Sequence, residues 1–159
     1  MSDSSEEKFM QRAIELAREG ADAGLGGPFG AVVVREGEII AEGQNCVPSN
    51  NDPTAHAEVI AIRRACEKLG AFHLSGCTVY SSCEPCPMCL SALYWAHVDR
   101  VFYAASRVDA AQAGFDDEML YRELASPMEA RKLPLQRILP ELGAQAFDAW
   151  NSKSDRVEY

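Results

Sequence analysis

The chain has 159 residues and a formal net charge of −9, with 47% hydrophobic and 25% charged residues. This length predicts one domain over residues 1–159, and the composition is typical of a globular protein, which argues against intrinsic disorder. Binding along a nucleic-acid backbone needs clustered lysine and arginine, so the acidic balance predicts that nucleic acid is not a partner.

The N-terminal segment and the cysteines predict the compartment. Residues 2–8 are polar and acidic, which excludes an ordinary secretory signal. No apolar run approaches the roughly 20 residues of a membrane helix, so we expect no membrane partner. Six cysteines in a chain without an export signal indicate a reducing compartment, where disulfides are rare. We therefore predict a cytoplasmic protein.

The first half of the chain predicts a helix, a hairpin and a second helix. Apolar residues recur at helical spacing over about 6–19. Two apolar runs, 31–34 and 38–41, are separated by Arg-Glu-Gly, whose glycine suits a tight turn, and they predict a β-hairpin. A loop rich in Pro, Ser, Asn and Asp follows over 46–53. A helix over about 54–69 ends at a glycine.

The next elements alternate between strand and helix. A strand over 77–80 runs directly into a group of cysteines, and two prolines predict the first turn of a helix over about 85–96. A fourth strand is expected over 100–104, and a helix over 116–124.

The last part of the chain predicts a fifth strand over 133–139 and a final helix over 142–150. Because helices and strands alternate after the hairpin, we expect an α/β fold. Its architecture would be a three-layer α/β/α sandwich around a central, mixed, five-stranded sheet.

Three of the six cysteines, Cys83, Cys86 and Cys89, fall within seven residues. In a reducing compartment, such crowding indicates metal binding or catalysis. By spacing alone, Cys83/Cys86 and Cys86/Cys89 are equally good C-x-x-C pairs. Helix geometry favours the second pair, because a helix opened by Pro85 would hold Cys86 and Cys89 on one face of its first turns. The helix dipole would favour their thiolate forms there.

His56 and Glu58 stand near the start of the preceding predicted helix. His56 supplies a third ligand suited to zinc, and a catalytic zinc commonly has three protein ligands and an open position for water. Two positions apart on a helix, the two side chains would diverge. Both can reach one metal only if it lies beyond the helix N-terminus, where Glu58 would serve as a proton carrier.

Two other metal centres share these ligands. A closed structural zinc would use His56 with Cys83, Cys86 and Cys89, and it would leave Glu58 without a task. An iron–sulfur cluster would start with the same C-x-x-C-x-x-C spacing. Its motif continues with a cysteine at the position where this chain has Leu93.

The segments 56–58 and 85–89 match the H-x-E…P-C-x-x-C signature of the zinc-dependent nucleobase deaminases. Further segments resemble the bacterial guanine deaminases of the cytidine deaminase-like fold. These are 26–30, Asn45, 52–56, 82–86, 94–96 and 114–117. The resemblance covers nearly the whole chain, and the Gly-Phe-Asp-Asp segment narrows it towards guanine.

This resemblance implies a hydrolysis of guanine to xanthine and ammonia, with one zinc ion per chain bound by His56, Cys86 and Cys89. Glu58 is then the general acid/base: it takes a proton from water, passes it to the ring nitrogen next to C2 and returns a proton to the exocyclic amine. Asp117 binds the guanine edge or assists the proton transfer. The resemblance also implies a homodimer, and a C-terminal active-site lid over 151–159.

The substrate-binding positions implied by the resemblance are Phe29, Asn45, Ala57, Trp95, Asp117 and Tyr159.

The residues themselves leave alternatives open at several of these positions. Phe29 can equally be a core residue after a turn, and Asn45 a loop cap. Trp95 can be packed in a core or an interface. Of the two neighbouring aspartates, Asp116 is expected to cap a helix and Asp117 to bind the guanine edge or assist the proton transfer, and the sequence alone does not assign the two roles.

Related substrates give alternative functions. Guanosine deaminase is the first, and cytosine or tRNA adenosine deaminase share only the zinc motif and the fold. A tRNA enzyme would need a basic surface, and the C-terminus has no basic cluster. A zinc module without enzymatic activity would keep the metal and turn over no nucleobase.

Overall fold

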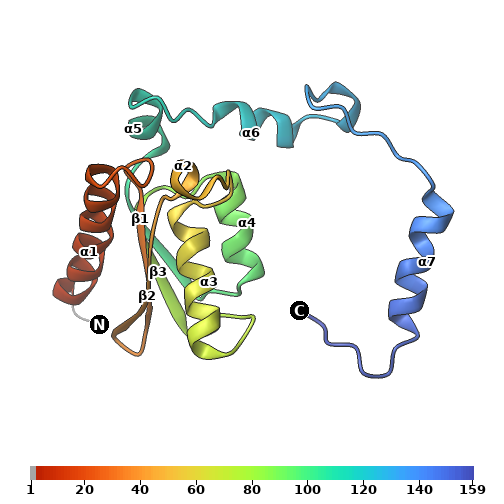
Figure 1. The fold of residues 1–159 in the computed structure, drawn as a ribbon, viewed down its shortest axis with the longest axis horizontal. Helices are drawn as coiled ribbons and strands as arrows, with labels where there is room; N and C mark the ends of the chain where they lie inside the picture. Colours follow the sequence, from red (N-terminus) through yellow and green to blue (C-terminus); the bar gives the residue numbers. More distant parts are fainter. Residues whose placement is uncertain (1–2) are drawn as a thin grey trace. The chain divides into compact units, whose positions relative to one another are not determined.

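The computed structural model describes residues 3–159, and the chain divides into two compact units, Met1–Asp117 and Glu118–Tyr159. The first unit contains one sheet with the strand order β2-β1-β3-β4. Its strands are β1 (Gly30–Arg35), β2 (Glu38–Gln44), β3 (Cys77–Cys83) and β4 (Arg100–Ala105) (Figure 1). β1 is antiparallel to β2 and β3, whereas β3 and β4 are parallel. The predicted mixed sheet is confirmed.

Helices cover both faces of this sheet. α1 (Asp3–Asp22) packs on one face, where Val32 belongs to the core. α3 (Ala57–Leu69) and α4 (Pro87–Trp95) cover the other face, where Val33 belongs to the core (Figure 1). Successive side chains of a strand point to opposite faces, so the continuous apolar run of β1 serves both cores. The first unit is therefore a three-layer α/β/α sandwich.

The first turn of α3 lies directly against β2 at Gly43. A Cβ at this glycine would overlap the carbonyl oxygen of Ala57 and would lie 2.7 Å from the backbone nitrogen of Ala61. Glycine permits this close approach of helix and strand backbones. Gly43 thereby sets how near to the sheet α3 begins.

Two helices were not expected from the sequence, and one helix begins later than predicted. A short helix, α2 (Val47–Asn50), lies within the predicted loop, and α4 begins at Pro87 rather than at Pro85. α5 (Arg107–Gln112) was not expected, because it carries little apolar periodicity. A capping box stabilises it: the Asp109 N–H donates to Ser106 Oγ at 3.3 Å, and the Ser106 N–H donates to Asp109 at 2.8 Å.

The second unit is helical, and the predicted fifth strand is wrong. Its elements are α6 (Glu118–Ala125), a 3-10 turn (Met128–Ala130) and α7 (Pro140–Asn151). Residues 133–139 form no strand, so the described part of the chain has a four-stranded sheet. Pro134 has no N–H for a strand ladder, and Leu139 takes a left-handed φ of 51° just before α7 begins. Among residues 3–159, no helix combines the length and apolar character needed to cross a membrane.

Candidate active site

Three side chains that could hold a metal ion converge where α3 and α4 begin. They are His56, Cys86 and Cys89, and together they form the metal group. His56 is the N-cap residue of α3 and Cys86 is the N-cap residue of α4. Both have extended backbone angles (φ −70° and ψ 155°, φ −64° and ψ 167°), and neither side chain caps its own helix. Their side chains are therefore free to project beyond the helix ends. This geometry is the one that the sequence requires if His56 and Glu58 are to serve a single metal.

The spacing of the three ligand atoms fits a zinc ion. His56 Nδ1 lies 3.6 Å from Cys86 Sγ and 3.5 Å from Cys89 Sγ, and all three atoms lie within 4.8 Å of one another. A tetrahedral zinc bonded at about 2.3 Å to sulfur and about 2.0 Å to nitrogen holds these atoms about 3.5 Å apart. Two thiolates and an imidazole are also ligands that zinc prefers.

Cys83 does not join this group in the described part of the chain. Its thiol instead donates to the Ser106 carbonyl oxygen at 3.7 Å, and burial is the main cause that raises its pKa to about 11. A neutral, hydrogen-bonded thiol is a poor metal ligand. The geometry therefore disfavours the closed structural zinc site with four ligands, as well as a cluster held by all three cysteines.

The charges within the group favour metal binding. The neighbouring Cys89 side chain, with a further contribution from His56, lowers the pKa of Cys86 to about 4. The interaction with Cys86 is in turn the main cause that raises the pKa of Cys89. The hydrogen bond with Cys86 also raises the pKa of His56. A side chain at position 86 that ionises readily, next to an imidazole, suits the binding of a metal cation, which needs deprotonated ligands.

Glu58 lies in the first turn of α3, beside the metal group, and is only 6% exposed. Burial is the main cause that raises the pKa of its carboxyl group, and a hydrogen bond from Ser81 Oγ to Oε1 at 3.0 Å opposes that effect. A carboxyl with a raised pKa can both accept and return a proton near neutral pH. Ser81 is not among the residues predicted from the sequence, although its signal there is a hydroxyl in a strand that leads to Cys83.

Asn45 follows β2 directly and is 7% exposed. Its Oδ1 accepts hydrogen bonds from the backbone N–H groups of Gly27 and Val47, each at 3.2 Å. The side-chain oxygen therefore caps a loop, which was one of the two interpretations of Asn45 from the sequence. The amino group of the same carboxamide has no hydrogen-bond acceptor among the described residues.

The two aspartates before α6 differ in environment. Asp117 is half-buried and Asp116 is exposed. Burial is the main cause that raises the pKa of Asp117, and the Cys86 thiolate adds to the effect, so the Asp117 carboxylate lies within electrostatic reach of the metal group. Since α6 begins at Glu118, the residue directly before it is Asp117. A helix cap at Asp116 stays a prediction.

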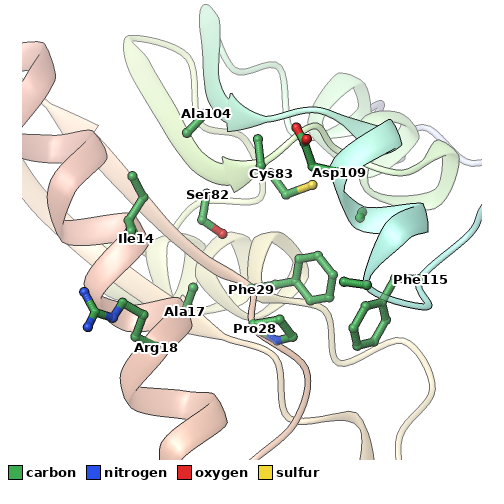
Figure 2. Close-up of a pocket in the computed structure, with 13 residues that line it drawn as sticks. Ile14, Ala17, Arg18, Pro28, Phe29, Ser82, Cys83, Ala104, Asp109 and Phe115 are labelled. Atoms are coloured by element: carbon green, nitrogen blue, oxygen red, sulfur yellow. The ribbon is translucent and has the colours of Figure 1, made fainter.

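Phe29 lines an apolar cavity of about 350 Å³ between α1 and α5 (Figure 2). Its ring meets Phe115 edge to face, with the ring centroids 4.9 Å apart. Cys83 forms part of the cavity wall. Among the described residues, those of the metal group do not line this cavity. Phe29 also packs against the core under α3, so it contacts both the cavity and that core.

The other predicted substrate positions are spread through the chain. Ala57 is fully buried at the first position of α3. Trp95 is 66% exposed and ends α4, about 13 Å along the nine-residue helix from its cysteine end. Trp95 is therefore not packed in the core of this chain. Tyr159 is 78% exposed and belongs to the second unit.

Known proteins match both the sequence and this geometry. The family described as the cytidine and deoxycytidylate deaminase zinc-binding region matches residues 3–105. Guanine deaminase of Bacillus subtilis is 55% identical over 96% of this chain and 98% of its own length, and its crystal structure superposes with a TM-score of 0.94. The tRNA-specific adenosine deaminase of Aquifex aeolicus is 41% identical over 62% of this chain and 65% of its own length.

More distant structures extend the comparison. Guanine deaminase from Nitrosomonas europaea is 35% identical over 69% of this chain and 64% of its own length, with a TM-score of 0.66. Two further structures that match at the same TM-score contain 2,6-diaminopurine and 8-azaguanine. The tRNA enzyme matches only part of the chain, whereas the Bacillus subtilis guanine deaminase matches nearly all of it. The chain therefore belongs to the cytidine and deoxycytidylate deaminase family of zinc-binding enzymes and, within it, to the guanine deaminases.

Proposed function

We propose that the protein hydrolyses guanine to xanthine and ammonia, with His56, Cys86 and Cys89 holding one zinc ion per chain. One observation carries the proposal: His56 Nδ1 lies 3.5–3.6 Å from two cysteine sulfurs, beside the buried carboxyl of Glu58. The 55% identity with a guanine deaminase over 96% of the chain supports guanine as the substrate. When bound, zinc supplies Lewis acidity that makes water a nucleophile at neutral pH.

Glu58 moves the protons of the reaction. Its carboxylate takes a proton from water and delivers it to the ring nitrogen next to C2, while the oxygen of that water forms a bond to C2. Glu58 then takes the proton of the new C2 hydroxyl and passes it to the exocyclic amine; as the C2=O bond forms, the C2–N bond breaks, and ammonia leaves instead of an amide anion. The Ser81 hydroxyl keeps the carboxyl oriented through its 3.0 Å hydrogen bond to Oε1. A positioned acid/base group of this kind contributes about 10²–10⁴-fold.

The remaining contacts with guanine are proposed from the family resemblance and from the placement of each side chain. Asn45 and Asp117 would bind the edge of the base, Phe29 would stack on its face, and Ala57 would contact it from the start of α3. Trp95 and Tyr159 would close the site together with a lid over 151–159 in a single functional domain. A lid would exclude water and strengthen the charge interactions around the metal.

We also propose a homodimer that works in the cytoplasm on a free nucleobase, without a nucleic-acid partner. The net charge of −9 supports a small-molecule substrate, and the thiolate ligands need a reducing compartment. Exposed apolar side chains such as Trp95 and Leu90 on α4 support an interface. Light scattering at micromolar concentration would give the mass of the assembly.

An ammonia-release panel tests the function. The purified, zinc-loaded protein is assayed with guanine, guanosine, cytosine, cytidine, adenine and adenosine, with metal analysis of the same sample. We expect turnover of guanine and about one zinc per chain. Turnover of guanosine but not of guanine would contradict the proposed substrate and leave the proposed deamination chemistry in place. A protein that binds zinc and releases no ammonia from any of the six would overturn the function itself.

A further inference from the structure

We propose that Gly26 is a positioning residue that, together with Gly27, locks the Asn45 carboxamide with its amino group towards the ligand. Asn45 can then recognise only a hydrogen-bond acceptor on the purine. The inference rests on the proposed function and adds to it the polarity of one substrate contact and the residue that enforces it.

The hydrogen bonds of Asn45 fix which end of its side chain is which. Oδ1 accepts from the N–H groups of Gly27 and Val47, each at 3.2 Å. Both partners are backbone donors, so an amino group placed there would face two donors and lose both bonds. An amide oxygen has two lone pairs, and both are used. The NH₂ group is therefore the end of the side chain that is left to meet a ligand.

Gly26 closes off the space in which the carboxamide could turn. A Cβ at this position would overlap both Asn45 Oδ1 and the backbone carbonyl oxygen of Asn45, and it would lie 2.9 Å from the carbonyl carbon of the same residue. Such a distance is too short for a side-chain carbon, so any residue other than glycine forces Asn45 to move. The backbone of Gly26 thus lies directly against the group that it positions.

The same chain segment is tied to the metal group. The Asn45 N–H donates to the Phe29 carbonyl oxygen at 3.1 Å, and the Cys46 N–H donates to the Ala55 carbonyl oxygen at 2.9 Å. Ala55 directly precedes His56. A shift of Asn45 would therefore displace the loop of Gly26 and Phe29 on one side. On the other side it would displace the segment that carries His56.

Guanine offers acceptors at O6, N3 and N7, any one of which an NH₂ donor can meet. An aspartate at position 45 would still accept the two backbone N–H bonds through one oxygen. Its other oxygen, however, would face the purine acceptor as a second acceptor. A site built around one buried hydrogen bond discriminates strongly when that bond is replaced by a repulsive pair.

The first test is Asn45→Asp in the zinc-loaded enzyme, with guanine as substrate. We expect kcat/KM to fall by about 100-fold or more, mostly through KM, with zinc content and melting temperature close to those of the unmodified chain. A KM within about twofold of the unmodified enzyme would overturn the inference. If the unmodified enzyme itself does not turn over guanine, the proposed function is wrong. That outcome is distinct from a failure of the inference on Asn45, which requires an active unmodified enzyme.

The second test asks whether Gly26 acts through Asn45. Gly26→Ala should lower kcat/KM by about tenfold or more in the unmodified chain and by a clearly smaller factor in an Asn45→Ala background, where only the clash with the backbone of residue 45 remains. Equal losses in both backgrounds would show a general structural role and overturn the positioning role. Gly143→Ala is the matched control, because a Cβ there meets nothing within 4 Å. If Gly26→Ala does not fold, Asn45→Asp still decides the polarity of the contact.

Discussion

The two units of the chain use their apolar residues differently. In the first unit β1 is buried along five of its six positions, and two cores cover the two faces of the sheet. In the second unit, Glu118–Tyr159, no described residue is buried, and α7 exposes Leu142 by 59% and Phe147 by 72%. Similar apolar content thus gives a packed core in one region and an open apolar surface in the other.

This difference shows where the chemistry is supported. Every residue of the metal group and its partners, including Glu58 and Ser81, stands on an element of the packed sheet unit. Elements fixed by a core can hold catalytic side chains to the tolerance that a reaction needs. The second unit does not bury its own apolar side chains, and exposed patches of this kind mark surfaces that bind something else.

The largest effect is expected at Glu58. Glu58→Gln keeps an oxygen that accepts the Ser81 hydroxyl but cannot carry the proton, so ammonia release from guanine should fall by at least about 10²–10⁴-fold. Metal analysis should show zinc retained. Glu67→Gln, an exposed glutamate on the same helix, serves as control and should keep full activity. Undiminished turnover by Glu58→Gln would remove Glu58 from the mechanism.

A pair of leucines tests the packing contrast itself. Leu74 is fully buried in the sheet unit, and Leu142 is 59% exposed on α7. Leu74→Ala should lower the free energy of unfolding by about 2–5 kcal/mol, whereas Leu142→Ala should change it by less than about 0.5 kcal/mol. Urea denaturation measures both. A loss of about 2 kcal/mol for Leu142→Ala would mean that α7 is covered in solution, and the contrast between the units would not hold.

A smaller effect is expected at Tyr80, whose hydroxyl is the one buried side-chain polar atom without a hydrogen-bond partner among the described residues. Its ring packs against Phe9 and Phe102, with centroid distances of 5.3 and 5.1 Å. Removing an unsatisfied hydroxyl relieves a desolvation cost, so Tyr80→Phe should raise the free energy of unfolding by up to about 1 kcal/mol. The control, Tyr94→Phe, alters a side chain that is 76% exposed and should be nearly neutral. Destabilisation by Tyr80→Phe would reveal a partner for the hydroxyl.

The smallest effect concerns an ion pair that joins α1 to β2. Arg12 donates to both carboxylate oxygens of Glu42, at 2.7 and 2.9 Å, and this bond is the main cause that lowers the pKa of Glu42 below its ordinary 4.5. Arg12→Met should cost less than about 1 kcal/mol near pH 7, because both groups are partly exposed.

The pH dependence has a defined sign. Since the folded-state pKa of Glu42 is lowered, the stabilisation is fully present above pH 4.5 and disappears as the pH falls through the folded-state value. The difference between Arg12→Met and the unmodified chain should therefore shrink in urea denaturation below that pH. Arg122→Met removes the exposed Arg122–Glu118 pair of α6, 3.3 Å apart, and should have a smaller effect at every pH. A difference for Arg12→Met that does not depend on pH would assign its effect to packing.

Local patterns predicted the sheet unit well. The β-branched run at 31–34, the Glu-Gly turn and the glycine after α3 each have a strong local preference, and the hairpin and both helices are confirmed. The metal group was also predictable, because His56 and the C-x-x-C spacing need only two helix ends that face each other. The start of α4 at Pro87 was missed, since Pro85 and Pro87 are equally suited to a first turn.

Other features depend on contacts that no local pattern contains. The run at 133–139 looks apolar enough for a strand, but a strand needs a neighbour, and Pro134 and Leu139 break its regular backbone. The role of Asn45 Oδ1 as a cap depends on Gly27, which lies eighteen residues earlier in the chain. Asp116 is exposed and Asp117 is half-buried. Two identical residues that are adjacent in the sequence give no sign of which one will be buried.

The convergence of His56, Cys86 and Cys89 has a thermodynamic consequence. His56 is separated from the cysteines by 30 and 33 positions, and the three meet only after α3 and α4 have docked on the sheet. The unfolded chain therefore has no preformed site, and the free energy of metal binding adds to the free energy of folding. By mass action, free zinc at 100 times the dissociation constant would add about 2.7 kcal/mol. The melting temperature of this protein is thus a function of the zinc supply.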